Sequence, residues 1–214
     1  METVIFANGE IGDYGALSAV INRDAYIVAA DGGLKHIRVL DLVPDLVIGD
    51  LDSIAGEEKS WLMDRGVEII QHDREKDETD LELALSFSLD NGSQKITVCG
   101  ATGGRLDQSL ANISLLSLPD LEEKQIKFDD GREEIFLIKN QLVLSGSVGD
   151  TVSLIPLFGR VEGIETEGLK YPLSGEVLFP EHTRGVSNVM EEEQAVIRVG
   201  SGSLLCIHTR KNTN

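Results

Sequence analysis

Short apolar runs alternate with segments of helical length through the first half of this 214-residue chain, and this alternation limits its fold more than any other feature. One helix is well marked, because Thr79 and Glu82 fit a capping box and Asn91-Gly92 supplies a stop. Strand–helix alternation with nearly continuous apolar strands predicts a parallel sheet covered by helices on both faces. The candidate strands are 3–7, 26–30, 45–49, 67–70 and 95–100.

After about Asp120 the pattern changes to short apolar runs separated by Gly, Pro, Asn or Ser, with no long helical period. Such spacing indicates an antiparallel sandwich or barrel. We therefore expect an α/β domain with a Rossmann-like parallel sheet over residues 1–124 and a β-sandwich domain over residues 125–214. The boundary is expected between Pro119 and Gly131. The runs in the second half are 134–138, 141–146, 151–157, 175–179, 195–200 and 203–208.

Charge and composition exclude several classes of protein. A net charge of −18 argues against a nucleic-acid partner. No apolar run approaches the ~20 residues of a membrane span, and the N-terminus lacks a signal-peptide pattern, so we expect no membrane partner and a cytoplasmic location. Cys99 and Cys206 each sit in an apolar run and are expected to be buried, reduced thiols.

Four polar turns follow predicted strands, at the carboxyl ends where open parallel sheets bind ligands. Each has an ordinary structural explanation, since Asp-Gly-Gly is a common turn and Thr79, Asp80 and Asp107 suit helix N-termini. These explanations are less convincing for the four turns taken together, because helix caps do not require four acidic turns at one edge of a sheet. The turns span residues 31–33, 49–53, 75–80 and 100–107.

Clustered carboxylates need a cation. Two like charges ~4 Å apart repel by about 4 kcal/mol at an effective dielectric near 20. Magnesium suits a few carboxylates, water and phosphate oxygens, and the i, i+2 pair Asp50 and Asp52 is best placed to share it. The turn 102–104 offers amides at the start of a helix, and Arg105 adds a bidentate phosphate donor. The sequence therefore predicts a magnesium-dependent enzyme that transfers a phosphate-containing group.

In this order the motifs resemble those of the thiamine pyrophosphokinase family, over nearly the whole chain. One departure is Gln108, where many relatives have histidine; an amide can position groups but cannot titrate near neutral pH. The motifs are DGG from Asp31, PDLVIGDLDS from Pro44, EKDETDLELAL from Glu75, GATGGRLDQSLANI from Gly100, GLKYPL from Gly168 and TRGVSN from Thr183.

The resemblance implies transfer of the terminal diphosphate of ATP to the hydroxyl of thiamine, giving thiamine diphosphate and AMP. It implies ATP and Mg²⁺ at the acidic turns, and a homodimer with thiamine near the subunit interface. Asp50, Asp52 and Asp80 are the expected metal ligands, and with Asp77 they form the expected catalytic set. Either Asp77 or Asp80 is the expected acceptor of the hydroxyl proton.

The remaining expected contacts also come from the resemblance. Lys35 and Lys76 are weaker phosphate candidates, because lysines beside acidic residues are usually surface pairs. The residue that stacks on thiamine stays open between Tyr171 and Phe179. The expected ATP contacts are Asp31, Gly32, Gly33, Thr79, Thr102, Gly103, Gly104, Arg105 and Asp107, and the expected thiamine contacts are Ser187 and Asn188.

Two other interpretations remain. A pyrophosphokinase for another hydroxymethyl heterocycle, such as a pterin, would keep the acidic turns but would not need GLKYPL and TRGVSN. A non-catalytic nucleotide or thiamine sensor would gain little from Asp50, Asp52, Asp77 and Asp80 together.

Overall fold

The protein is represented by a computed structural model that describes residues 1–50 and 56–211. The chain divides into two compact units, Met1–Gly131 and Arg132–Asn214. The strand β6 (Gln125–Asp129) pairs in parallel with β5 (Lys95–Cys99) and belongs to the first unit, whereas the sequence pattern placed residues 125–129 in the second domain.

A parallel sheet forms the centre of the first unit, as the alternating pattern predicts. Its strand order is β6-β5-β1-β2-β3-β4, and neighbouring strands pair in parallel. The carboxyl ends of these strands therefore share one edge, and the direction of winding reverses between β1 and β5. The remaining bounds are β1 (Glu2–Phe6), β2 (Tyr26–Ala30), β3 (Leu46–Gly49) and β4 (Glu68–Gln71).

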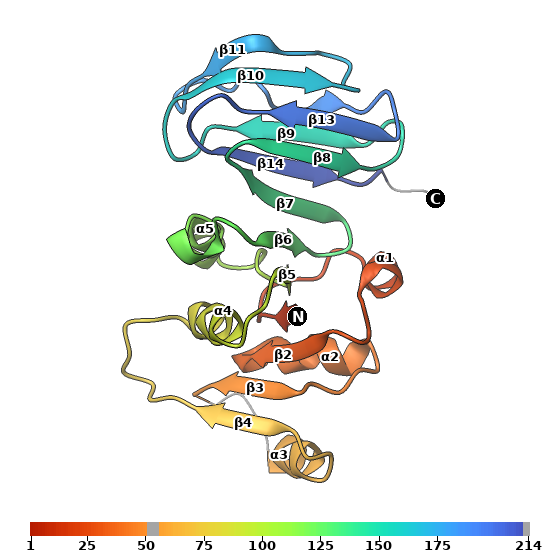
Figure 1. Ribbon diagram of the computed structural model, residues 1–214. Helices are drawn as coiled ribbons and strands as arrows, with labels where there is room; N and C mark the ends of the chain where they lie inside the picture. Colours follow the sequence, from red (N-terminus) through yellow and green to blue (C-terminus); the bar gives the residue numbers. More distant parts are fainter. Residues whose placement is uncertain (51–55, 212–214) are drawn as a thin grey trace. The chain divides into compact units, whose positions relative to one another are not determined.

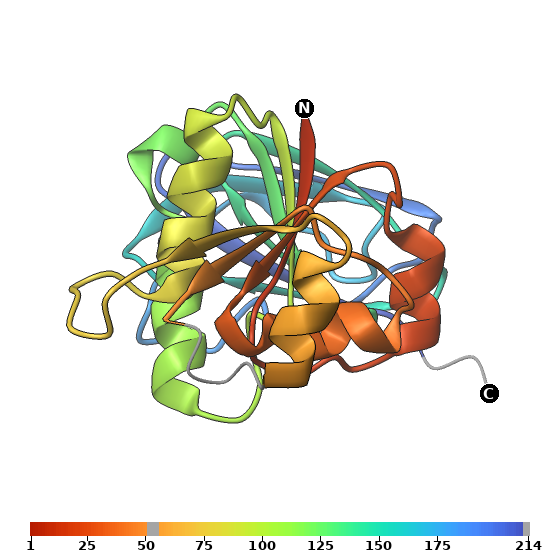
Figure 2. The same ribbon diagram turned by 90° about the horizontal axis from the view of Figure 1, so that it is seen from below.

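Helices cover both faces of this sheet. Figures 1 and 2 show α4 and α5 on one face and α1, α2 and α3 on the other. Phe6, Leu17, Ile37 and Leu62 are fully buried between sheet and helices, and each contributes about 1.5–3 kcal/mol by leaving water. Among the described residues no helix is long and apolar enough to cross a bilayer. The helices are α1 (Tyr14–Val20), α2 (Leu34–Val39), α3 (Gly56–Met63), α4 (Asp80–Asp90) and α5 (Leu106–Leu115), with short 3₁₀ turns η1 (Asp31–Gly33) and η2 (Pro119–Leu121).

The two helices that follow acidic turns begin differently. In α4 the Thr79 hydroxyl accepts from the Glu82 amide at 3.2 Å, which confirms the predicted cap, and Asn91 occupies the C-cap. In α5 the cap position is Arg105, with no side-chain cap bond. Asp107 lies in the first turn and accepts from the Gln108 amide at 3.0 Å, so it is not the N-cap that the ordinary explanation required.

The second unit is an antiparallel sandwich, as expected. One layer has the order β12-β9-β14-β7 and the other β11-β10-β13-β8, with antiparallel pairings in both. Side chains from both layers, among them Leu154, Ile164, Ile197 and Cys206, form one core. The strands are β7 (Glu133–Ile138), β8 (Gln141–Ser145), β9 (Thr151–Ile155), β10 (Val161–Glu167), β11 (Ser174–Leu178), β12 (Asn188–Val189), β13 (Gln194–Arg198) and β14 (Leu204–Thr209).

Both cysteines are buried as free thiols, as the sequence predicts. Burial is the main cause that raises the pKa of the Cys206 thiol to about 12, and it raises the pKa of Cys99 as well. Both thiols are therefore protonated near neutral pH and behave as small apolar core residues.

A buried histidine in the second unit lies between two carboxylates. His208 Nδ1 is 2.9 Å from Glu134 Oε2, and His208 Nε2 is 2.9 Å from Asp150 Oδ2. Burial alone would lower the pKa of His208, but the hydrogen bonds and charges of Glu134 and Asp150 outweigh it and raise that pKa. Burial also opposes ionisation of Asp150, but amide bonds from Lys211 and Ser147 and the contact with His208 hold the Asp150 pKa below its usual value.

These shifts predict a pH-dependent stability. The contribution of charged His208 is fully present below the unfolded-state pKa of about 6.5 and is lost as pH rises through the raised folded-state pKa. The contribution of Asp150 acts in the opposite direction, because it is lost as pH falls through its lowered pKa.

We expect His208→Gln to destabilise the chain by about 3 kcal/mol near pH 6, since it removes the positive charge between Glu134 and Asp150, while Arg210 still lies 3.1 Å from Glu134 Oε1. The difference in melting temperature should shrink as pH rises, which thermal unfolding between pH 6 and pH 9 measures. His182→Gln, at an exposed position, is the matched control. A His208→Gln difference that is constant over this range would contradict the assignment of a charged His208.

Candidate functional site

Main-chain hydrogen bonds join the turns that follow β1 and β5. The Ala7 amide donates to Cys99 O, the Gly9 amide to Gly100 O and the Glu10 amide to Thr102 O, each at 2.8 Å. The two turns lie where the sheet reverses its winding, which is the place where open parallel sheets bind ligands. They therefore form one continuous backbone surface at the carboxyl edge.

Glycines make this close approach possible. A Cβ placed on Gly9 would overlap the carbonyl oxygens of Gly100 and Thr102. A Cβ on Gly103, which has a φ of 91°, would lie 2.6 Å from the Cβ of Glu10. No larger residue fits these positions unless the turns separate.

The Asp31–Gly33 turn after β2 lies against the same surface. A Cβ on Gly33 would overlap Phe6 O, and a Cβ on Gly32 would lie 2.6 Å from the Asn8 side chain. On the other side, a Cβ on Gly49 would lie 3.2 Å from the Cβ of Asp31. The turns after β5, β1, β2 and β3 are thus neighbours along one edge, and Asp31 and Asp50 come from adjacent turns.

The predicted metal-binding carboxylates are paired with cations in the described part of the chain. Arg74 Nε lies 3.7 Å from Asp50 Oδ2, and Lys76 Nζ donates to Asp80 Oδ1 at 2.5 Å. Lys76 and Asp80 are both partly buried, so this pair is not the exposed surface pair that the sequence favoured for Lys76. α4 follows β4 and begins at the carboxyl edge, which places Thr79 and Asp80 on the same side as the other turns.

Of the other two members of the predicted catalytic set, only Asp77 belongs to the described residues. Asp77 is exposed in the segment between β4 and α4. Asp52 lies outside the described residues. In the described ranges no group of three His, Cys, Asp or Glu side chains is arranged to hold a metal ion. The available ligand atoms are hard carboxylate oxygens, which suit magnesium. Binding of magnesium by Asp50 and Asp80 would require that their ion pairs with Arg74 and Lys76 break.

The glycine-rich turn before α5 presents backbone amides. Gly103 and Gly104 have φ values of 91° and 67°, and neither amide donates to an acceptor in the described residues. Arg105 binds Asp107 through two hydrogen bonds, at 3.1 and 2.5 Å. This contact raises the pKa of Arg105 and lowers that of Asp107, so both groups are charged at neutral pH. Arg105 is therefore pre-aligned at the start of the helix rather than free.

The structure adds Asn8, Gly9, Tyr14 and His36, which the motifs did not indicate. Lys35, one of the weaker phosphate candidates, lies beside them, and its Nζ donates to Asn8 O at 2.9 Å and to Asn8 Oδ1 at 2.7 Å. The buried His36 has Nε2 3.1 Å from Gly9 O and Nδ1 2.6 Å from the Tyr14 hydroxyl. The only signal in the sequence was Asn8-Gly9 directly after a predicted strand, which is also an ordinary turn sequence.

In the second unit the two predicted thiamine contacts differ. Ser187 is exposed and has a φ of 61°, which is uncommon for a residue other than glycine. Asn188 is buried, and its side chain accepts from the Tyr171 amide at 3.0 Å and donates to Tyr171 O at 2.7 Å. Asn188 therefore fixes the backbone of Tyr171, whereas Ser187 presents its hydroxyl to solvent.

The aromatic side chains left open for stacking are both accessible. Tyr171 is 60% exposed and Phe179 is 37% exposed, so neither is a core residue. The ammonium of Lys170 lies 5.6 Å from the Tyr171 ring centroid, and His182 packs edge-on against Phe179. Trp61, in contrast, lies on α3 between the guanidinium groups of Arg38 and Arg65, which agrees with a packing role.

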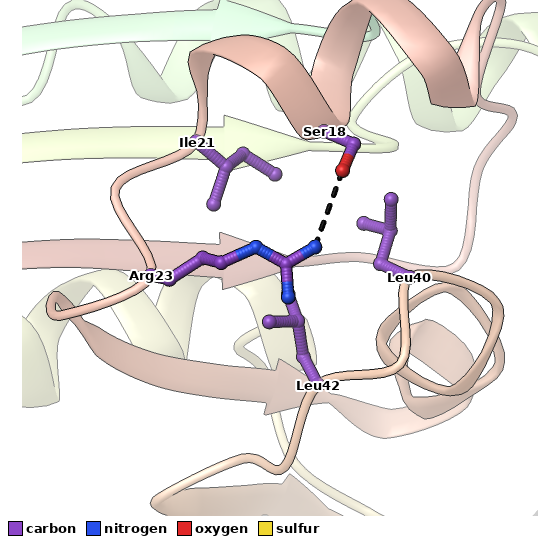
Figure 3. Close-up of a pocket in the computed structure, with 5 residues that line it drawn as sticks. All are labelled: Ser18, Ile21, Arg23, Leu40 and Leu42. Atoms are coloured by element: carbon purple, nitrogen blue, oxygen red, sulfur yellow. Dashed lines mark hydrogen bonds between the residues drawn. The ribbon is translucent and has the colours of Figure 1, made fainter.

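A small pocket in the first unit lies away from these turns. It encloses about 140 Å³, open solvent included, between Ser18, Ile21, Arg23, Leu40 and Leu42 (Figure 3). These residues lie at the ends of α1 and α2 and precede β2 and β3, so the pocket is at the amino edge of the sheet. Arg23 is held there by a 3.3 Å bond to Ser18. We do not assign the predicted chemistry to this pocket.

Two family models match the chain, one in each half. The model described as "Thiamin pyrophosphokinase, catalytic domain" matches residues 17–129, more than half of the chain. The model described as "Thiamin pyrophosphokinase, vitamin B1 binding domain" matches residues 139–204.

Individual proteins agree with these matches. The chain is 26% identical to "Thiamine pyrophosphokinase" of Bacillus subtilis, over 98% of this chain and 99% of that protein. It is 32% identical to "Thiamine pyrophosphokinase 1" of Oryza sativa, over 75% of this chain and 63% of the rice protein. A solved structure of the B. subtilis thiamine pyrophosphokinase has the same fold, with a TM-score of 0.88 and 24% identity over 99% of this chain and all of that one.

The close approach of Gly33 to the Phe6 carbonyl allows a test of whether the turn after β2 packs against the end of β1. We expect Gly33→Ala to destabilise the protein by about 2–4 kcal/mol, because the new Cβ would overlap the Phe6 carbonyl oxygen. Gly56→Ala is the matched control, since a Cβ there meets nothing within 4 Å. Thermal unfolding should show a large loss for the first variant and none for the second. Equal melting temperatures would show that the two turns do not meet as described.

Proposed function

The chain belongs to the thiamin pyrophosphokinase family, and on that basis we propose that it transfers the terminal diphosphate of ATP to the hydroxyl of thiamine, releasing AMP. The observation that carries this proposal is the presence of both family models in one chain, the catalytic model first and the vitamin B1-binding model second. A pyrophosphokinase for a pterin would not need the vitamin B1-binding domain that the second model describes. A sensor is also disfavoured, because the relatives carry enzyme names and the four acidic residues are present.

We propose that ATP binds along the carboxyl edge of the first unit. The amides of Gly103 and Gly104 and the guanidinium of Arg105 would bind phosphate oxygens, with Asp107 keeping Arg105 aligned. The turns at Asp31, Gly32, Gly33, Thr79 and Thr102 would contribute the surrounding contacts, as the resemblance implies. What supports this arrangement is the row of adjacent turns, which offers amides and one arginine within a strongly acidic chain.

Magnesium is part of this proposal. Asp50, Asp52 and Asp80 would hold it, and when bound it would neutralise the phosphate charge that the carboxylates otherwise repel. Arg74 and Lys76, which now pair with Asp50 and Asp80, would then be released towards the phosphates. Lys76 is therefore a stronger candidate for phosphate binding than the sequence alone suggested.

In the proposed reaction the thiamine hydroxyl oxygen attacks the β-phosphorus of ATP. A bond forms between them, and the bond from the β-phosphorus to the oxygen shared with the α-phosphorus breaks, so AMP leaves with that oxygen. The hydroxyl proton passes to a carboxylate. We assign this role to Asp77, because Asp77 is exposed, whereas Asp80 is one of the carboxylates that would hold magnesium. Most of the acceleration would come from positioning and charge stabilisation.

Thiamine is assigned to the second unit, with the Ser187 hydroxyl as a direct contact and the exposed ring of Tyr171 as the stacking partner. Asn188 would act through the Tyr171 backbone. We further propose a homodimer with the thiamine site near its interface, supported by the exposed apolar side chains Phe158 and Phe179. The buried free thiols support a reducing cytoplasmic location.

Incubation of the protein with magnesium, ATP and thiamine, followed by chromatography, tests the reaction. We expect AMP and thiamine diphosphate in equal amounts, and loss of both products when a chelator removes the metal. Formation of ADP with thiamine monophosphate would overturn the proposed transfer, and no product at all would favour the sensor.

The role of Asp52 gives a sharper test. Asp52→Asn should lower kcat by about 100-fold or more while the melting temperature stays unchanged, because an amide is a poor ligand for magnesium. Asp64→Asn is the matched control: it makes the same carboxylate-to-amide change at an exposed residue that precedes β4, at the opposite edge of the sheet. Normal magnesium-dependent turnover in Asp52→Asn would remove Asp52 from the site.

Alanine substitutions at Ser187 and Asn188 should differ in their effect on the melting temperature. We expect Ser187→Ala to raise the KM for thiamine with the melting temperature unchanged, because its side chain is exposed. Asn188→Ala should also lower the melting temperature, since it leaves the Tyr171 amide and carbonyl without their partner. Steady-state kinetics and thermal unfolding of both variants check this, and an unchanged thiamine KM in both would move the thiamine site elsewhere.

A further inference from the structure

We propose that Tyr14 and His36 are positioning residues for ATP, and that they act by fixing the Gly9 carbonyl behind the glycine-rich turn that would bind phosphate. The inference rests on the proposed function, because it concerns the same nucleotide site. Neither residue touches the Gly103 and Gly104 amides in this arrangement. Both act through the backbone of the turn after β1.

The hydrogen bonds define the state of the histidine. Gly9 O can only accept, so His36 Nε2, 3.1 Å away, carries the hydrogen. His36 is 3% exposed, and burial, followed by the charge of Lys35, lowers the pKa of His36, so its ring is neutral near pH 7. Nδ1 is then an acceptor, and the Tyr14 hydroxyl at 2.6 Å donates to it. Tyr14 thereby selects the tautomer that holds Gly9.

The held carbonyl belongs to the centre of the site. Gly9 donates its own amide to Gly100 O, and Glu10 donates to Thr102 O, so a shift of Gly9 moves the turn before α5. His36 is itself adjacent to that turn, because a Cβ on Gly100 would lie 3.3 Å from His36 Nε2. A single imidazole therefore bonds to one turn and lies beside the other, at the point where the sheet reverses its winding.

A second residue of α2 supports the same arrangement. Lys35 binds the carbonyl and side chain of Asn8, so consecutive carbonyls, those of Asn8 and Gly9, are held by consecutive residues of one helix. The Lys35 bond is exposed to water, whereas the His36 side chain is buried and its bond to Gly9 is partly shielded. The more shielded bond is the stronger constraint, because water replaces it less readily when it is lost.

Binding of the non-transferable analogue α,β-methylene-ATP with magnesium, measured by calorimetry without thiamine, tests this inference. We expect His36→Leu to raise the Kd about tenfold and Tyr14→Phe about threefold, since each removes hydrogen bonding that orients the turn. His36→Gln should stay within about threefold of the unsubstituted chain, because its amide can still donate to Gly9 O. This rescue separates a loss of the donor from a loss of packing.

Thr3→Val is the matched control. It removes the buried Thr3–Ser93 hydrogen bond of 2.6 Å at the amino edge, so it should lower the melting temperature and leave the Kd unchanged. An unchanged Kd in both His36→Leu and Tyr14→Phe overturns the inference, as does an equal loss of affinity in Thr3→Val. If His36→Leu does not fold, Tyr14→Phe carries the test.

The same experiments distinguish failure of the proposed reaction from failure of the positioning role. Analogue binding that weakens as expected in these variants, without any diphosphate transfer to thiamine by the unsubstituted chain, supports the positioning role and overturns the reaction. No binding by the unsubstituted chain overturns both.

Discussion

Backbone contact between the turns after β1, β2 and β5 is the constraint on which the candidate site depends. The sheet is parallel, so its carboxyl ends share an edge, but this alone does not bring the turns together. Gly9, Gly33 and Gly100 do so, because their missing side chains let one turn lie directly against the next. The hydrogen bonds from Gly9 and Glu10 to the β5 turn then fix their spacing. The amides that we propose bind phosphate and the acidic side chains are thus carried by turns whose backbones contact one another.

Charge is the second organising factor. The chain has a net charge of −18, and its site would bind an anion. In the described residues three acidic groups at this edge each pair with a cation: Asp50 with Arg74, Asp80 with Lys76 and Asp107 with Arg105. Such pairing lowers the repulsion among carboxylates. In the proposed function the same cations would become available to phosphate once a metal binds the carboxylates, which would link the proposed metal and nucleotide sites.

Much of this could be predicted from local pattern. Strands β1 to β5 follow from continuous apolar runs, and the cap at Thr79 follows from its spacing to Glu82, because both depend on residues close in sequence. β6 was not predicted, because polar residues interrupt its short sequence QIKFD. β10 was missed because Gly163 and three glutamates interrupt its apolar alternation, and β12 because it has only two residues. The Tyr14–His36–Gly9 contacts were also missed, since nothing local indicates that a helical histidine binds a carbonyl 27 positions away.

The sequence by itself therefore determined the two-part architecture, the edge of the sheet where the acidic turns gather and the family. It did so because periodicity, turn composition and motif order are properties of neighbouring residues. Only the tertiary structure decided which turns touch, that Asn188 supports Tyr171 rather than presenting its amide to solvent, and that His36 is neutral and fixed in one tautomer. Those facts depend on burial and on distances between residues far apart in the chain, and such distances exist only once the chain has folded.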